Sequence, residues 1–176
     1  RPKVKTEAHI SDNLAELVCS NSFRSDDMNN NAVGLLHAEM RELNSLIISC
    51  ADKNKIPAGG ALAVDRDQFS QSVHKIILEH PLINIIHKEY KNLPDFSKKA
   101  IIATGPLTSK SLTQNIIKST GNENLAFFDA IAPIVYSDSI NMDIAWLQSR
   151  YDKIGTLGDE DAYINCPLNK DEYINF

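Results

Sequence analysis

Residues 57–66 read Pro-Ala-Gly-Gly-Ala-Leu-Ala-Val-Asp-Arg. A proline followed shortly by two glycines predicts a turn, because these residues supply the backbone angles that a tight change of direction needs. The apolar run Ala61–Val64 that follows is typical of a short strand. Asp65 or Asp67 can then cap a helix. A turn, a strand and a helix start in immediate succession indicate α/β structure.

Helical spacing of apolar residues continues on both sides of this stretch. We expect one long helix over roughly 31–51, a second from Asp65 or Asp67 to Pro81, and a third over roughly 109–119 that Gly121 stops. The apolar face expected for the first helix consists of Val33, Leu36, Met40, Leu43 and Ile47. A face of this kind is interpreted as core rather than as a cofactor site.

Apolar segments between and after the helices are typical of strands. Leu82–Ile86 and Lys99–Ala103 are predicted strands, another short strand is expected around Tyr90, and Phe127–Val135 is strand-like. Strands that alternate with helices favour an α/β fold. After Gly121 the alternation of helices and strands gives way to an apolar run and then to a polar, loop-rich part. We therefore predict a lobe boundary there, between residues 1–121 and 122–176.

The composition is that of a soluble globular protein. Of the 176 residues, 43% are hydrophobic and 23% are charged, and the formal net charge is -5. The overall balance has no basic excess, so it does not by itself suggest a nucleic-acid partner. No apolar run is long enough to span a bilayer. The three cysteines are too irregularly spaced for a disulfide framework or a zinc site, which favours a reducing cytosol and no structural metal.

The cysteines differ in their settings. Cys19 precedes a run of capping residues, Ser20–Asp27, that can open a helix, and a thiol near a helix N-terminus is activated as a nucleophile. The alternative is a buried, inert cysteine, which is the commoner case for a lone cysteine. Cys50 lies among apolar neighbours in the first predicted helix and is interpreted as core. For Cys166, in an Asn-Cys-Pro setting, a reactive and a structural role both stay open.

Two further segments carry candidate contacts. Ala103–Gly105 follows a predicted strand, where a small, tight turn lets the backbone approach a cofactor closely, although an ordinary strand-to-helix turn is the simpler interpretation. Arg150–Lys153 combines two cations, an anion and an aromatic ring, which suits stacking and phosphate contacts as well as a solvated turn. No partner is visible in the sequence for the histidines, which are His9, His37, His74, His80 and His87.

Several motifs in a fixed order resemble the TrmFO family. They read AELVCSNSFRSD at 15–26, NAVGLL at 31–36, PAGGALAVDR at 57–66, IATGPLTS at 102–109, DAIAPIV at 129–135, SRYDK at 149–153 and NCP at 165–167. Each motif alone is a weak signal. Their order, and their spread over nearly the whole chain, make the resemblance specific.

The resemblance implies a partial glutathione-reductase-like FAD-binding domain with an inserted smaller α+β lobe. Members of the family are cytoplasmic flavoproteins that take a one-carbon unit from methylenetetrahydrofolate and reduce it with flavin, ultimately using NAD(P)H. They place the methyl group on C5 of a T-loop uridine in tRNA. An enzyme thiol adds to C6 of the uracil, which makes C5 nucleophilic.

The resemblance also assigns roles by position. Cys19 is expected to be the catalytic thiol near the flavin ring. The expected FAD contacts are Ser20, Asn21, Ser22, Arg24, Ala103, Thr104 and Gly105. The expected substrate contacts are Arg150, Tyr151 and Lys153. No metal is expected.

The chain also departs from the family pattern. The Gly-rich loop that holds the FAD pyrophosphate is missing and is expected before Arg1, and the second essential cysteine, in a Gly-Cys-Met-Pro setting, is expected beyond Phe176. We therefore expect an internal fragment with weak or absent FAD binding and no methyl transfer by itself. It would be a cut piece, one half of a split enzyme with a companion chain, or a folded remnant. Missing strands predict a homodimer or an exposed apolar patch.

Two alternatives stay open. One is the related flavoprotein that modifies wobble uridine with a carboxymethylaminomethyl group, although Val18–Ser22 favours the TrmFO family. The other is a non-catalytic remnant that binds RNA or protein. Flavin colour and tRNA retardation would distinguish these classes.

Overall fold

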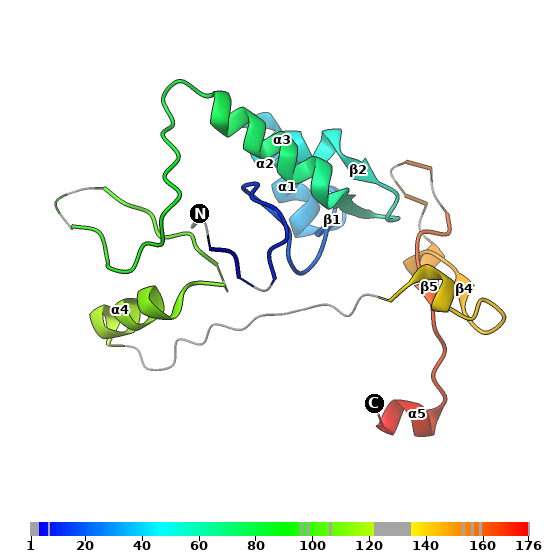
Figure 1. The fold of residues 1–176 in the computed structure, drawn as a ribbon. Coiled ribbons are helices and arrows are strands. Elements are labelled where there is room, and N and C mark those ends of the chain that lie inside the picture. Colours follow the sequence, from blue (N-terminus) through cyan, green and yellow to red (C-terminus); the bar gives the residue numbers. More distant parts are fainter. Residues whose placement is uncertain are drawn as a thin grey trace.

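The computed structural model describes residues 4–6, 8–95, 97, 99–105, 107–121, 135–152, 154–155, 157–158 and 160–175. Helices and short strands alternate along the first part of the chain, and a smaller lobe of short elements follows (Figure 1). In chain order the elements are β1 (Ser22–Ser25), α1 (Ala32–Glu42), α2 (Leu46–Lys53), β2 (Lys55–Ile56), β3 (Ala61–Val64), α3 (Arg66–Glu79), α4 (Lys110–Thr120), η1 (Ser137–Ser139), β4 (Trp146–Leu147), η2 (Arg150–Asp152), β5 (Ile164–Asn165) and α5 (Lys170–Asn175). The expected mixture of helix and strand is confirmed.

The predicted strand Ala61–Val64 is β3, the centre of a three-stranded sheet ordered β1-β3-β2. Both pairings are antiparallel, and Ser22 and Ser25 of β1 face Ala63 and Ala61 of β3 across a register shift. Arg24 lies in this irregularity with φ of 72°. A bulge of this kind re-aims side chains along a strand. The run Ser20–Asp27 was expected to open a helix, and that prediction is wrong, because its middle pairs with β3.

The core lies where α2 and α3 pack on the sheet. It consists of Ile48, Cys50, Ala51, Leu62, Val64, Phe69 and Val73, all nearly inaccessible to solvent. Phe23 of β1 reaches this cluster edge-on, with its ring centroid 5.4 Å from that of Phe69. Burial of a phenylalanine side chain stabilises a fold by about 2–3 kcal/mol. The prediction that Cys50 is a core residue is confirmed.

The single long helix expected over 31–51 is wrong. The chain forms α1 and α2, separated at Leu43–Ser45, and Asn44 has φ of 54°. Asn44 N donates to Arg41 O and Ser45 N to Met40 O, which is the bonding of a Schellman end. The turn redirects the predicted apolar face, so Leu36 and Leu43 are 51% and 80% exposed instead of forming core.

The other two helices are confirmed, and α3 begins after the expected cap, Asp65. Asp65 accepts a hydrogen bond from Gln68 N at the start of α3, and Ser109 accepts one from Leu112 N at the start of α4. Gly121 ends α4 in the left-handed conformation, with φ of 65°. The lobe boundary at Gly121 stays a prediction.

The strands predicted at Leu82–Ile86, around Tyr90 and at Lys99–Ala103 are wrong. These segments pair with no strand among the described residues, and Leu82 and Ile101 are 89% and 93% exposed. Apolar sequence alone does not make a strand, because the backbone donors and acceptors need a neighbour to pair with. Residues 127–134 of the strand-like run Phe127–Val135 lie outside the described residues, and Val135 is exposed.

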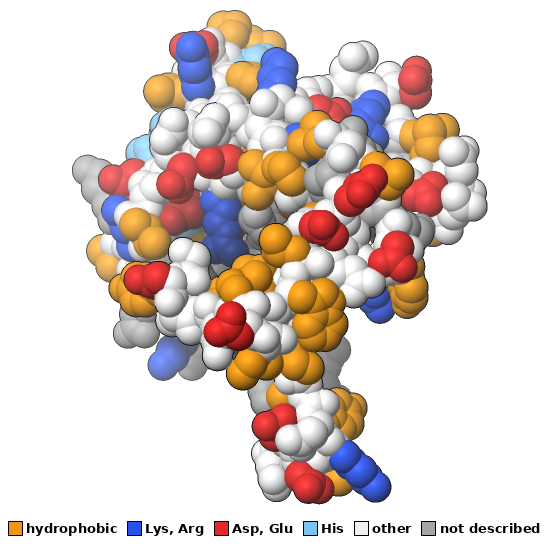
Figure 2. All heavy atoms as spheres, turned by 90° about the vertical axis from the view of Figure 1, so that its right-hand side faces the viewer, with side chains coloured by type: hydrophobic (Ala, Val, Ile, Leu, Met, Phe, Trp, Pro, Cys, Tyr) orange, Lys and Arg blue, Asp and Glu red, His pale blue; other side chains and the backbone are white. Residues whose placement is uncertain are grey.

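The C-terminal lobe is a two-stranded antiparallel ribbon with short helical turns around it. Trp146 pairs with Asn165 and Leu147 with Ile164. Figure 2 shows hydrophobic side chains gathered among acidic ones on the face of the molecule that lies at the right of Figure 1, where the ribbon lies. The expected exposure of apolar surface is therefore present. None of the helices in the described part of the chain is long and apolar enough to cross a membrane.

Candidate functional site

The Cys19–Arg24 segment is held against the centre of the sheet. Val64 N donates to Asn21 O at 3.0 Å, and Asn21 Nδ2 donates to Val64 O at 3.0 Å. Arg66, in the first turn of α3, donates from Nη2 to Cys19 O at 3.0 Å. The backbone is thereby held at the carbonyl of the half-buried Cys19 and again at Asn21, two residues further on. Cys19 precedes a strand, so its predicted place at a helix N-terminus is wrong.

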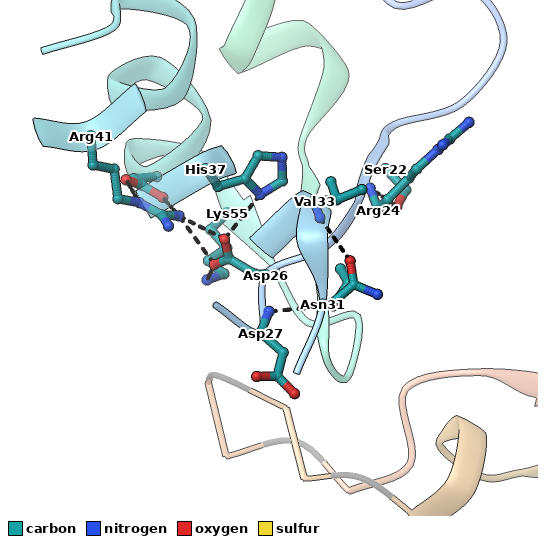
Figure 3. Close-up of polar contacts among 11 residues, drawn as sticks. Ser22, Arg24, Asp26, Asp27, Asn31, Val33, His37, Arg41 and Lys55 are labelled. Atoms are coloured by element: carbon teal, nitrogen blue, oxygen red, sulfur yellow. Dashed lines mark hydrogen bonds and ion pairs between the residues drawn. The ribbon is translucent and has the colours of Figure 1, made fainter. Parts of the chain in front are cut away.

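The serines of this segment bond to their own backbone. Ser20 Oγ accepts from Ser22 N and Ser22 Oγ accepts from Arg24 N, both at 3.0 Å. These turns satisfy donors at the β1 edge of the sheet, where no further strand pairs within the described part of the chain. The Arg24 side chain is exposed and lies near Ser22 (Figure 3).

Asp26, directly after β1, is the centre of a buried charge cluster (Figure 3). Its carboxylate is 3.2 Å from His37 Nδ1, 2.9 Å from Arg41 Nη2 and 3.0 Å from Lys55 Nζ, and its side chain is only 6% exposed. Arg41 also binds Asp52 at 2.7 Å. The cluster therefore ties the end of β1 to α1, α2 and β2.

The cluster shifts the acidity of its members. Burial raises the pKa of Asp26, but hydrogen bonds from Lys55, Arg41 and His37 and the charge of Lys55 outweigh it, so the net pKa is lowered. The hydrogen bonds that Arg41 donates to Asp52 are the main influence that raises the pKa of Arg41. Asp26 is thus an anion that neutralises two fixed cations, which suits a structural anchor rather than a proton-transfer group.

The loop before α1 packs very closely on that helix. Asn31 N donates to Asp27 O, and Asn31 Oδ1 caps the helix by accepting from Val33 N (Figure 3). Gly34 is buried, and a methyl group on its Cα would overlap the backbone carbonyl of Asp27. The position therefore requires glycine for space, since its φ is not in the left-handed region.

The Asp26 cluster was not predicted from the sequence. His37 was assigned no partner, yet it is buried against Asp26, and His74 Nδ1 accepts from Leu14 N. The partners lie 11 to 29 positions from Asp26 and meet only through the sheet and the break between α1 and α2. No short spacing in the sequence encodes such a cluster.

Ala103–Gly105 is an exposed stretch without regular secondary structure. Thr104 Oγ1 and Gly105 O both bond to Thr108 Oγ1, and Gly105 has φ of 67°. Figure 1 places residues 99–105 and the β4–β5 ribbon at opposite sides of the helices. The predicted cofactor turn and the predicted substrate contacts are therefore not brought together.

Arg150 and Tyr151 lie together on the exposed turn η2. The Arg150 guanidinium lies 5.2 Å from the centre of the Tyr151 ring, and Tyr151 is 77% exposed with φ of 61°. Asp152 accepts from Gln148 Nε2 at 2.7 Å. Lys153, the third predicted contact, lies outside the described residues. A stacked cation and ring can contact a base or a phosphate.

A family model described as glucose inhibited division protein A matches residues 3–176 of the chain. The chain belongs to this family. Within the described residues, no group of His, Cys, Asp and Glu side chains could hold a metal ion.

Relatives in this family carry a more specific name. The chain is 60% identical over 180 residues to a protein of Caulobacter vibrioides, 61% over 176 to one of Bartonella henselae and 60% over 177 to one of Mesorhizobium japonicum. Each is named methylenetetrahydrofolate–tRNA-(uracil-5-)-methyltransferase TrmFO. The alignments cover 99–100% of the chain but 38% of each relative. The resemblance to TrmFO proteins is confirmed, and the chain spans well under half their length.

Proposed function

We propose that this chain supplies part of a folate- and FAD-dependent tRNA (uracil-5-)-methyltransferase that acts on the T-loop uridine. The observation that carries the proposal is identity of about 60% to proteins named for this activity, along essentially the whole chain. The proposal includes a glutathione-reductase-like setting for the flavin, NAD(P)H as the final reductant and a cytoplasmic location. Other segments, on the same or a companion chain, supply the pyrophosphate loop and the second thiol.

Within this proposal, Cys19 is the catalytic thiol and Ser20–Arg24 contacts the cofactor. The Asn21–Val64 and Arg66–Cys19 hydrogen bonds support this role, because they hold the backbone at the Cys19 carbonyl and at Asn21. FAD would supply reducing equivalents to the transferred carbon. Ala103–Gly105 is assigned to a second flavin contact, and Arg150, Tyr151 and Lys153 to the tRNA.

The described residues fit a flavin only in part. Ser22 N and Arg24 N, two donors that could face a cofactor, are bonded to serine hydroxyls, and Ala103–Gly105 is open to solvent. These groups do not enclose a cofactor, and no catalytic step through the flavin follows from them. Their arrangement agrees with a partial site that other segments complete.

The decisive experiment is a FAD titration followed by flavin fluorescence. We expect weak or no binding by the chain alone. We expect binding when the chain is mixed with the remaining segments of a relative that carry the Gly-rich loop. Tight binding by the isolated chain would contradict the partial site. Absence of binding in both samples would favour the alternative, a folded remnant without catalytic function.

Measuring methyl transfer by the completed enzyme then tests whether the Cys19 thiol is catalytic. Cys19→Ser should abolish transfer to a tRNA T-arm, whereas Cys166→Ser, at an exposed cysteine outside the Cys19 segment, serves as the matched control. Retained transfer in the Cys19 variant would remove its catalytic role while leaving the family assignment intact.

A further inference from the structure

The C-terminal lobe meets the core at the Ala58–Gly60 turn. Tyr163, directly before β5, donates its hydroxyl proton to Ala58 O at 2.8 Å across 105 positions of sequence. Gly59 is buried with φ of 55°, and a methyl group on its Cα would lie 3.4 Å from Ser149 Oγ and 3.5 Å from Tyr163 Cε2. The turn thus presents bare backbone to the lobe, and the lobe packs on it.

The Ala58–Gly60 turn is also hydrogen-bonded to the end of the segment that carries Cys19. Gly60 O accepts from Asp26 N at 2.9 Å, and Ala58 O also accepts from Ala61 N at 3.1 Å. Asp26 is held by the buried charge cluster, and β1 immediately precedes it. A contact made to the turn is therefore a contact to a rigid part of the Cys19 region.

On the lobe side, Tyr163 is coupled directly to the Arg150–Tyr151 turn. Gln148 N donates to Tyr163 O at 2.9 Å, and Ser149, which is 2% exposed, accepts from Ala162 N through its hydroxyl at 3.3 Å. Arg150 follows Ser149 in the chain. The Tyr163 ring and the proposed tRNA contacts therefore belong to one hydrogen-bonded unit.

We propose that Tyr163 is a positioning residue: its hydroxyl, bonded to Ala58 O, docks the lobe on the Ala58–Gly60 turn and sets where Arg150 and Tyr151 lie relative to Cys19. The docking itself stands on the contacts above, and only its meaning for tRNA rests on the proposed function. Loss of the hydroxyl leaves the lobe folded but lets it move on the core.

The single tryptophan of the chain, Trp146, lies in β4 and reports on the lobe alone. Time-resolved anisotropy of its fluorescence should decay in the native chain with the slow rotation of the whole molecule. Tyr163→Phe should add a nanosecond component, the timescale of segmental motion. Tyr173→Phe, at an exposed ring in α5, is the matched control and should leave the decay unchanged. A decay in Tyr163→Phe identical to the native one would overturn the proposal.

A second pair of variants tests the other side of the contact. Gly59→Ala and Gly59→Leu share the backbone strain at this φ, but only leucine extends into Ser149 and Tyr163. The nanosecond component should appear with leucine and not with alanine, and equal decays would count against docking at this turn. The anisotropy is independent of cofactor and tRNA, so its failure is distinguishable from failure of the FAD titration.

Discussion

Asp26 is the residue on which the charged groups beneath β1 converge. His37 and Arg41 of α1 and Lys55 of β2 share one carboxylate. A buried ion cluster of this kind contributes little net stability compared with an apolar core, but removal of its centre leaves cations buried without a counter-ion. The cluster therefore acts on the placement of β1 rather than on catalysis.

Asp26→Asn should destabilise the chain by about 3 kcal/mol, because it removes the buried anion that Lys55 contacts and leaves Arg41 paired with Asp52 alone. The pKa of Asp26 is lowered in the folded state, so its contribution is complete above its ordinary value of 3.8 and is lost as the pH falls through the lowered value. Urea unfolding should show the lower stability of the variant at pH 7, and the two proteins should converge only below pH 3.8, as the pH falls through the lowered pKa of Asp26. Asp52→Asn, at a carboxylate that is 38% exposed, is the control and should cost less than about 1 kcal/mol. Equal losses in both variants would refute the central role of Asp26.

Gly34→Ala tests the closest backbone approach in the core region. The added methyl group would overlap the Asp27 carbonyl, so α1 must move away from the loop. We expect a loss of about 1–3 kcal/mol in urea unfolding, although alanine is the better helix former. Glu39→Ala, on the exposed side of the same helix, should change stability by less than about 0.5 kcal/mol. A Gly34→Ala variant more stable than the native chain would show that the loop at Asp27 can move away from α1 at little cost in free energy.

At the scale of elements, the sequence predicts those helix ends and strands that are determined by residues close together in the chain. The cap at Asp65, the stop at Gly121 and the strand Ala61–Val64 are all local, and all are confirmed. The break at Asn44 was missed because the apolar period continues through it. β1 was missed because its serines, and Asn21 before it, also suit a helix cap, and only pairing with β3 distinguishes the strand from a cap.

Replacement of Asn44 by glycine should leave the stability of the chain nearly unchanged, whereas replacement by alanine should lower it. Its φ of 54° is left-handed, a conformation that costs a residue with a Cβ about 1–2 kcal/mol and that asparagine adopts more readily than most. Asn44→Ala should therefore lower the free energy of unfolding by about 1 kcal/mol, and Asn44→Gly should be near neutral. If alanine were neutral, α1 and α2 would have merged into the continuous helix that the sequence suggests, and helical circular dichroism would rise.

At the scale of the whole molecule, charge is unevenly distributed along the chain. Residues 135–176 hold eight acidic and three basic residues, whereas the remainder holds 15 of each, so this lobe accounts for the whole formal charge of -5. Figure 2 shows acidic side chains spread over the face on which the ribbon lies. Phosphate recognition depends on cations that displace counter-ions, and such a lobe offers few of them. Arg150 and Lys153 would have to bind tRNA despite the repulsion between its phosphates and the acidic side chains of this lobe.

This balance predicts that the chain alone retards tRNA in a gel weakly at low salt and not at about 150 mM salt. Asp143→Asn, Glu160→Gln and Asp161→Asn combined remove three charges from the lobe, and Glu39→Gln, Glu42→Gln and Glu79→Gln remove three from the helices. If Arg150 and Tyr151 face the tRNA, the lobe variant should bind more tightly than the helix variant at the same net charge, because the removed charges lie nearer the phosphates. Equal gains in both variants would mean that the tRNA responds only to total charge, and the lobe would then lose its proposed place beside the substrate.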